Sequence, residues 1–504
     1  MQPLLLRNGH VVDGTGAPAF VGDVLVADSR IAAIGRLEPP ADAQIAGCAG
    51  LTIAPGFIDA HSHSDLQVIE GKREKVVQGV TSEVVGNCGF SAYPAARDSR
   101  ALREFANGIF CGDDTWGWSS SEAYLNAVAQ TPAASVASLV GHGSLRIAVA
   151  GNRLGPLPES DVARMESLLD EALGAGAAGF STGLMYAPGS SAPFDELARL
   201  CRVVARHGKI YTSHIRSYFS GLVAAIEEQI ELARRTGCRL QISHLQAVGA
   251  PNWDQQPHAL ERIERARARG IDIAFDCYPY IAGSTVLTQL LPQWALEGGV
   301  PGMMIRLNST EDRRSIAKEI ESTNSWRWAD IHISAVGSEQ NQTAVGRNLF
   351  ELAELRSCEP VDAMLDLLIE ERGAVNMISF NQSEENLRQS LAHPLSIVIS
   401  DGFYVRGKAH PRLYGTFPLL LGTFVRDRKW LTLEDAVHKI TARPAERFGF
   451  EKRGKLAPGY HADITIFDSA LIGSPATYDD PARAPVGIQC VLRNGHVIEG
   501  SVPV

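Results

Sequence analysis

The segment PGFIDAHSHSD, at residues 55–65, combines a short apolar run with two histidines, His61 and His63. Alternate residues of an extended segment lie on the same face, so both imidazoles can converge on one metal ion. Two surface or capping histidines would give the same pattern. The interpretation therefore depends on what the other segments of the chain contribute.

Runs of the same kind recur along the chain: each is apolar, ends in polar residues and precedes an amphipathic stretch. Such βα repeats are typical of a parallel sheet. We predict an α/β protein whose residues 55–447 form a (β/α)8 barrel of the TIM type. The predicted strands end at His61, Asn87, His142, Thr182, His214, His244, Tyr278 and Asp401. A ninth candidate, VNMISF at residues 375–380, leaves the strand near the seventh position open, and an insertion is expected at about 285–345.

The two ends of the chain share a second motif, LRNGHVVDG at residues 6–14 and LRNGHVIEG at residues 492–500. Each places Asn-Gly between alternating apolar residues, which favours a two-residue hairpin because both turn positions need a positive φ. We therefore predict a small composite β-sandwich domain formed by residues 1–54 and 448–504. The barrel would be inserted between its two halves.

The composition of the 504 residues is that of an ordinary globular protein, with 45% hydrophobic and 21% charged residues. The formal charge of -10 and the absence of runs of like charge argue against a nucleic-acid partner. No apolar run approaches the roughly 18 residues that span a bilayer, so no membrane partner and a cytoplasmic location are expected. The eight cysteines contain no Cys-x-x-Cys pair, which favours reduced thiols.

In a barrel of this type, the catalytic site lies at the carboxyl ends of the strands. Four further residues near those ends suit a metal site: Cys88 in GNCG, His214, His244 and Asp401 in ISDG. Taken singly, an inert buried thiol, core histidines and a turn aspartate would explain them. Because they follow successive strand ends around one rim, they predict a metal centre with Asp401 as its acid–base residue.

Together, these motifs resemble the N-acyl-D-amino-acid deacylases, or D-aminoacylases, a branch of the amidohydrolase superfamily. The resemblance runs nearly end to end and rests on PGFIDAHSHSD, GNCG, YTSHIR, QISHL, DCYPY, AGST, ISDG, HPRLYGTFP and GKLAPGYHADITIFD. It implies a zinc-dependent enzyme that hydrolyses the amide of N-acyl-D-amino acids to a carboxylate and a free D-amino acid. The fourth segment, AAGFSTGL, lacks the carboxylated lysine of most amidohydrolases, and the resemblance puts Cys88 in its role.

The resemblance also implies the roles of the metal ligands. It assigns a tightly bound zinc to Cys88, His214 and His244, and a second, weaker site beside it to His61 and His63. One or two metal ions are therefore expected.

For the substrate, the resemblance implies Asp401 as general base toward water and then as acid toward the departing amine. Arg412, in HPRLYG, would bind the α-carboxylate, which a planar guanidinium matches well. Tyr278, Tyr280 and Ser284 lie in matching motifs and would hydrogen-bond the same group. Packing against the barrel rim is the alternative for both tyrosines.

Gln246 departs from the family pattern, which places a lysine two residues after the last zinc-binding histidine. A glutamine keeps hydrogen-bond donors but carries no charge, so carboxylate recognition changes at this position. Arg216, in SHIRS, either compensates or caps neighbouring carbonyl groups. The acyl group, the side-chain preference and the oligomeric state do not follow from the sequence, and the D preference rests on the resemblance alone.

Two other functions remain open. A cyclic-amide hydrolase of the dihydroorotase or hydantoinase kind would share the histidines and Asp401, but it normally needs the lysine of the fourth strand. A non-enzymatic scaffold homologue would have lost metal ligands, whereas every ligand position is filled here.

Overall fold

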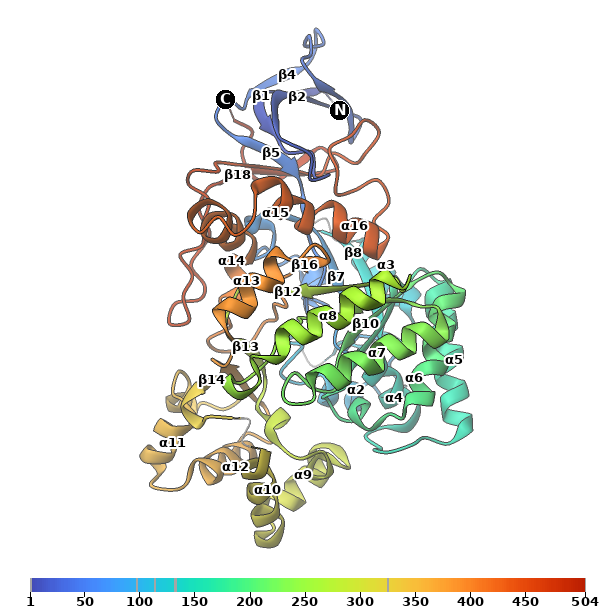
Figure 1. The fold of residues 1–504 in the computed structure, drawn as a ribbon, viewed down its shortest axis with the longest axis vertical. Coiled ribbons are helices and arrows are strands. Elements are labelled where there is room, and N and C mark those ends of the chain that lie inside the picture. Colours follow the sequence, from blue (N-terminus) through green and yellow to red (C-terminus); the bar gives the residue numbers. More distant parts are fainter. Residues whose placement is uncertain (1, 97, 113–114, 131–133, 324–325, 504) are drawn as a thin grey trace.

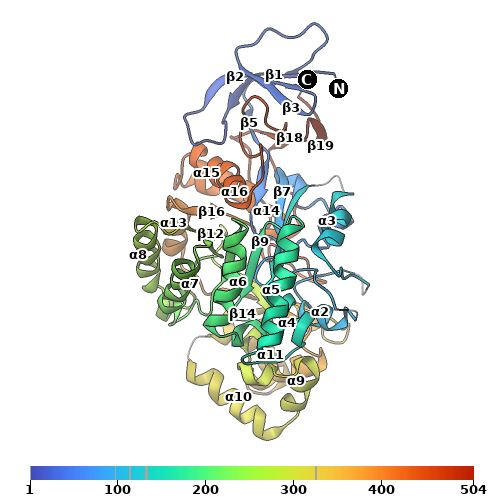
Figure 2. The ribbon, with the colours of Figure 1, turned by 90° about the vertical axis from the view of Figure 1, so that its right-hand side faces the viewer.

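The structure, a computed structural model, describes residues 2–96, 98–112, 115–130, 134–323 and 326–503. A sheet built from both chain ends lies at one end of the long axis, the barrel lies in the middle, and a helical insertion lies at the other end (Figures 1 and 2). No helix in the described part of the chain combines the length and apolar character that crossing a membrane requires.

Eight parallel strands form the barrel, in the spatial order β16-β12-β11-β10-β9-β8-β7-β6. They are β6 (Phe57–Asp59), β7 (Val80–Val85), β8 (Ser135–Gly141), β9 (Gly179–Gly183), β10 (Ile210–His214), β11 (Arg239–Ile242), β12 (Ile273–Cys277) and β16 (Ser396–Val398). The first and last strands meet where Asp401 N–H donates to the His61 carbonyl at 2.8 Å. These are the eight predicted strands, so the predicted fold class is confirmed.

Helices surround the barrel because their apolar residues recur at helical spacing. In α6, for example, Leu197, Leu200, Cys201 and Val204 are all buried. The helices are α1 (Gln67–Glu70), α2 (Arg100–Phe105), α3 (Ser121–Ala129), α4 (His142–Ala150), α5 (Glu159–Gly174), α6 (Phe194–Arg206), α7 (Leu222–Thr236), α8 (Gln255–Ala268), α13 (Glu384–Ala392), α14 (Arg412–Leu419), α15 (Leu433–Ile440) and α16 (Ala442–Phe448).

The position that the sequence left open is filled by β12, which pairs with β11 on one side and β16 on the other. VNMISF instead forms β15 (Val375–Ser379), in an antiparallel sheet with β13 (Gly283–Val286) and β14 (Ile331–Val336). The segment inserted between β12 and β16 therefore extends well beyond residue 345. A short apolar run is compatible with a strand in either sheet, so the sequence did not indicate which strands VNMISF pairs with.

The insertion also contains four helices, which pack with its sheet around their own apolar core. They are α9 (Gly299–Leu307), α10 (Thr310–Thr323), α11 (Leu349–Arg356) and α12 (Pro360–Glu370).

The chain ends share one sheet, in the order β19-β18-β17-β5-β1-β2-β3, with β4 beside β1. Its strands are β1 (Leu4–Val11), β2 (Phe20–Ala27), β3 (Arg30–Gly35), β4 (Gln44–Gly47), β5 (Thr52–Pro55), β17 (Ile464–Phe467), β18 (Ile488–Arg493) and β19 (His496–Gly500). The antiparallel pair β5 and β17 joins the two ends. Leu6, Val24, Ile464 and Leu492, all fully buried, belong to one apolar core that both chain ends share.

The two Asn-Gly motifs have different structures. Asn494 and Gly495 form the predicted hairpin, with φ values of 49° and 77° between the paired residues Arg493 and His496. The hairpin expected at residues 8–9 is wrong, because β1 runs straight through them with an irregularity in its pairing to β2. Asn8, with φ 59°, donates its N–H to Asp23 Oδ1 at 2.8 Å. The asparagine is left-handed in both places, and the pairing with the neighbouring strand decides whether a bulge or a hairpin forms.

The composite core predicts a stability effect of Leu492→Ala. Removing this fully buried side chain leaves a cavity between strands from both chain ends, so we expect a loss of about 2–5 kcal/mol in unfolding free energy and a lower thermal midpoint. Val497→Ala, on the adjacent strand and 43% exposed, is the matched control. Equal thermal midpoints for the two variants would contradict the shared core.

Candidate active site

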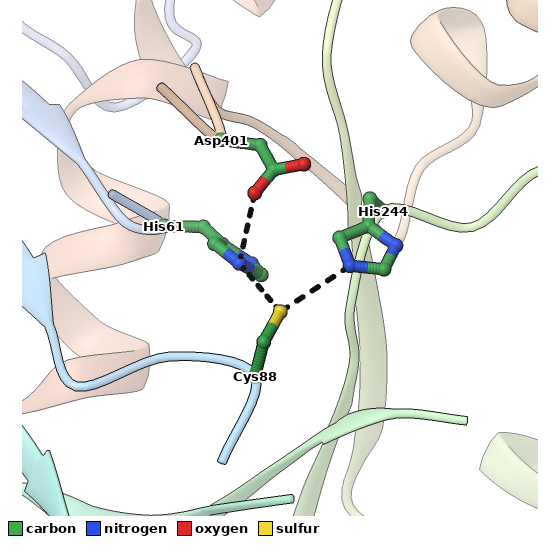
Figure 3. Close-up of side chains that lie close together, drawn as sticks. All are labelled: His61, Cys88, His244 and Asp401. Carbon is green, nitrogen blue, oxygen red and sulfur yellow. Dashed lines mark hydrogen bonds and ion pairs between the residues drawn. The ribbon is translucent and has the colours of Figure 1, made fainter. Parts of the chain in front are cut away.

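Four side chains from different strand ends converge at the mouth of the barrel: His61, Cys88, His244 and Asp401 (Figure 3). Cys88 Sγ lies 3.2 Å from His61 Nε2 and 3.4 Å from His244 Nε2. Asp401 Oδ1 lies 3.3 Å from His61 Nε2. All four are buried, and one ligand atom of each lies within 4.8 Å of the others. A thiolate, imidazoles and a carboxylate are ligand types that zinc accepts, so the set fits such an ion.

Three members of this cluster have a left-handed backbone. The φ values are 53° at Cys88, 34° at His244 and 50° at Asp401. This region is costly for residues with a side chain, on the order of 1–3 kcal/mol each, and persists only where the surroundings impose it. The backbone strain is thus concentrated on residues whose side chains belong to the candidate metal cluster.

The loop that carries Cys88 approaches its neighbours more closely than side chains would permit. A Cβ on Gly86, where φ is +80°, would lie 2.2 Å from the Leu139 carbonyl oxygen. A Cβ on Gly183 would lie 2.0 Å from the Cys88 carbonyl oxygen. Glycine at both positions therefore lets the thiol reach the barrel axis.

His214 lies beside the cluster, with its ring centroid 4.7 Å from that of His244. Both of its ring nitrogens are buried without a hydrogen-bond partner. Burial holds the pKa of His214 well below its usual value and lowers that of His244 to about 4. Both imidazoles are therefore neutral at pH 7, the state in which their nitrogens can bind a metal.

Burial also raises the pKa of the Cys88 thiol. A metal cation opposes this effect, because a coordinating thiol is deprotonated. The fifth predicted ligand, His63, reaches the same rim, with Nε2 3.3 Å from Asp401 Oδ1.

Asp401 faces a buried cation as well as the histidines. Burial raises the pKa of its carboxyl, but the charges of Arg412 and His61 more than offset this, and the pKa lies well below its usual value. Arg412 Nη1 lies 2.9 Å from Asp401 Oδ2. The guanidinium also lies over the Tyr278 ring, 4.7 Å from its centroid. Asp401 is thus a carboxylate with a fixed orientation.

Asp276 is a site residue that the sequence analysis missed. Its Oδ1 accepts the backbone N–H of His244 at 2.6 Å and lies 3.5 Å from His61 Nδ1. Gln241 Nε2 donates to its other oxygen at 3.1 Å. Such a carboxylate orients the ring of a ligand histidine. The available signal was a charged residue inside the otherwise apolar run IAFDC, at residues 273–277.

A cavity of about 680 Å³ opens over the cluster. Of the predicted substrate-binding residues, it is lined by Gln246, Tyr278, Ser284 and Arg412. Gln246 Nε2 donates to the Tyr278 hydroxyl at 2.8 Å. Ser284 contributes its carbonyl, which accepts from Arg412 Nη2 at 3.2 Å.

The other two predicted residues do not line this cavity. Arg216 Nε lies 2.9 Å from a Glu228 oxygen, and its other nitrogens donate to the Ser190 and Ala192 carbonyls at 2.6 Å. Arg216 therefore caps carbonyl groups. The Tyr280 ring packs edge-on against His410, 5.0 Å between centroids.

The cluster geometry predicts that Cys88→Ala lowers the affinity for zinc. Because even outer-shell partners of a metal contribute about tenfold or more to its affinity, losing the thiolate should exceed that. The measurement is zinc retained after dialysis against a chelator of known affinity. Cys277→Ala, which removes a buried thiol outside the cluster, is the control. Equal retention by both variants would exclude Cys88 as a ligand.

Comparison with known proteins agrees with this geometry. A model of the amidohydrolase family matches residues 44–498. The chain is 37% identical to N-acyl-D-glutamate deacylase and 35% identical to D-aminoacylase of Alcaligenes xylosoxydans xylosoxydans. These alignments cover 99% and 98% of this chain, and 94% and 93% of those proteins.

Among solved structures, N-acyl-D-glutamate deacylase from Bordetella bronchiseptica, complexed with zinc and a phosphonate inhibitor, superposes with a TM-score of 0.85. It is 35% identical, and the match covers 99% of this chain and 97% of that one. Dihydropyrimidinase from Brevibacillus agri, at 15% identity and a TM-score of 0.56, shares the fold alone. The chain belongs to the amidohydrolase family, in the branch of the N-acyl-D-amino-acid deacylases.

Proposed function

We propose that this chain is a zinc-dependent enzyme that hydrolyses N-acyl-D-amino acids to a carboxylate and a free D-amino acid. The observation that carries the proposal is the buried cluster of His61, Cys88, His244 and Asp401 beside Arg412, at the base of one cavity. Candidate metal ligands, a carboxylate and a cation therefore lie close enough together for one small molecule to contact all of them. The zinc and phosphonate complex of the similar Bordetella protein, described as a mimic of the tetrahedral intermediate, supports the same chemistry.

Cys88, His214 and His244 are the proposed ligands of the tightly bound zinc, and His61 and His63 those of a second, weaker site. The unpartnered nitrogens of His214 and the contact between Cys88 and His244 support the first set. Zinc bound there would polarise the acyl carbonyl and acidify a water molecule.

The remaining steps belong to protein side chains. Asp401 takes a proton from the attacking water on Oδ1 and returns it to the departing amine nitrogen. Arg412 binds the α-carboxylate, since its buried Nε makes no hydrogen bond within the protein. Tyr278 lies against the guanidinium and restricts its orientation.

A cyclic-amide hydrolase is the weaker candidate. The strand-four lysine that such enzymes normally use is absent from β9, and no lysine occurs among the described residues that line the cavity. The domain bounds at residues 1–54 and 448–504, the absence of nucleic-acid partners and a cytoplasmic location remain predictions of the sequence.

The proposal predicts the outcome of Asp401→Asn on a panel of N-acetyl-D-amino and N-acetyl-L-amino acids, a hydantoin and a dihydroorotate. We expect release of D-amino acids by the zinc-loaded parent and a loss of about 10²–10⁴-fold in kcat for the variant, because the amide cannot take up the proton. Bound zinc, measured in parallel, shows whether the centre survives. Turnover of the cyclic compounds alone would contradict the proposal.

Gln246 predicts a preference for substrates with neutral side chains. Arg412 is the one cation among the described residues that line the cavity, and Asp401 already pairs with it. We expect N-acetyl-D-leucine to exceed N-acetyl-D-glutamate in kcat/KM, because an acidic side chain would lack a free counter-charge. Gln246→Lys should reduce that ratio.

The matched control is Gln342→Lys, which adds the same charge at an exposed position of the insertion. A parent enzyme that prefers the glutamate substrate would refute the role of Gln246 without affecting the reaction class.

A further inference from the structure

A second cavity, of about 850 Å³, adjoins the one over the metal cluster. The two share four lining residues: Ile109, Met185, Tyr186 and Gln289. The shared residues make the second cavity a continuation of the active site, and the roles proposed above leave it without an occupant.

The second cavity has a largely apolar lining, and its apolar residues come from two separate hydrophobic cores. Its apolar residues outside the shared set include Phe90, Phe105, Pro188, Val286, Leu296, Val300 and Met303. Phe90 belongs to the barrel core and Met303 to that of the insertion. Phe105, Leu296 and Val300 are only partly buried, although each packs on one of these cores. The charged lining residues Glu104 and Arg372 are exposed. The interior therefore suits an apolar ligand.

A single aromatic layer separates this cavity from the metal ligands. The Tyr186 ring lies 4.9 Å from His214 and 5.0 Å from Phe90, between centroids. Phe90 lies 6.4 Å from His63 and stacks on Phe105 at 4.6 Å. If the carbonyl carbon of a substrate lies at the metal cluster, a chain attached to that carbon would pass these rings to enter the second cavity.

The barrel topology indicates which part of a substrate points that way. Tyr186 follows β9, the fourth barrel strand, and Arg412 follows β16, the eighth. Fourth and eighth strands face each other across a barrel of eight. With its carboxylate on Arg412 and its amide at the cluster, a substrate directs its acyl group toward Tyr186 and Met185.

We infer that the second cavity is an acyl-binding site, and that the natural substrates carry an extended apolar acyl chain rather than an acetyl group. The inference rests on the proposed function and adds the class of acyl donor. Each methylene that enters the apolar cavity should raise kcat/KM by about fourfold until the cavity is filled.

The test is kcat/KM of the zinc-loaded enzyme for one D-amino acid carrying acetyl, butanoyl, hexanoyl or octanoyl groups. We expect a continuous rise, with octanoyl at least about tenfold above acetyl. A flat or falling series overturns the acyl site while the reaction class stands. No cleavage of any member, acetyl included, means that the proposed function itself fails.

Val300→Phe tests the location of the site, because the larger ring occupies the cavity. The ratio of octanoyl to acetyl kcat/KM should fall at least about fivefold in this variant. Ile305→Phe, on the same helix α9 but 73% exposed, should keep the parent ratio. An unchanged ratio in folded Val300→Phe overturns the assignment. The length series of the parent enzyme decides the acyl preference even if this variant does not fold.

Discussion

The hydrogen bond from Asp401 N–H to the His61 carbonyl joins the last barrel strand to the first. It closes the barrel and, at the same point, places the Asp401 carboxylate beside His61 and His63, which follow the first strand. Below it, Asp59 binds Lys75 Nζ at 2.5 Å and the Ser400 N–H at 3.0 Å, all buried. A fully paired ionic group at this seam reinforces one register of the two strands, because a slip would leave buried charges without partners.

The residues of the site have a strained backbone, but their positions are fixed by hydrogen bonds and packing. Cys88, His244 and Asp401 adopt backbone conformations that residues with side chains avoid. Asp276 accepts the backbone N–H of His244 and lies beside the His61 ring. Barrel strands on all sides impose these conformations. The side chains are therefore oriented before any metal or substrate arrives, so binding needs little rearrangement of the protein.

The insertion changes what the barrel can accommodate. Ser284 and Met377 of its sheet line the cavity over the metal cluster, and α9 lines the cavity beyond it. The barrel mouth thus supplies the clustered histidines, thiol and carboxylate, while the insertion supplies part of the lining of both cavities. Residues of this kind of segment vary without disturbing the barrel, which allows one reaction to serve different acyl groups and side chains.

From the sequence alone, the eight strand ends and the residue types that gather at the barrel mouth, Asp401 among them, could be inferred, because period and residue chemistry are local properties of the chain. The partner of VNMISF, the bulge at Asn8 and the support from Asp276 could not, and the choice between the two roles offered for Arg216 needed the structure. Each of these depends on which distant segment lies alongside. That is decided only when the strands pack into closed sheets, since a local pattern specifies which face is buried but not what is buried against it.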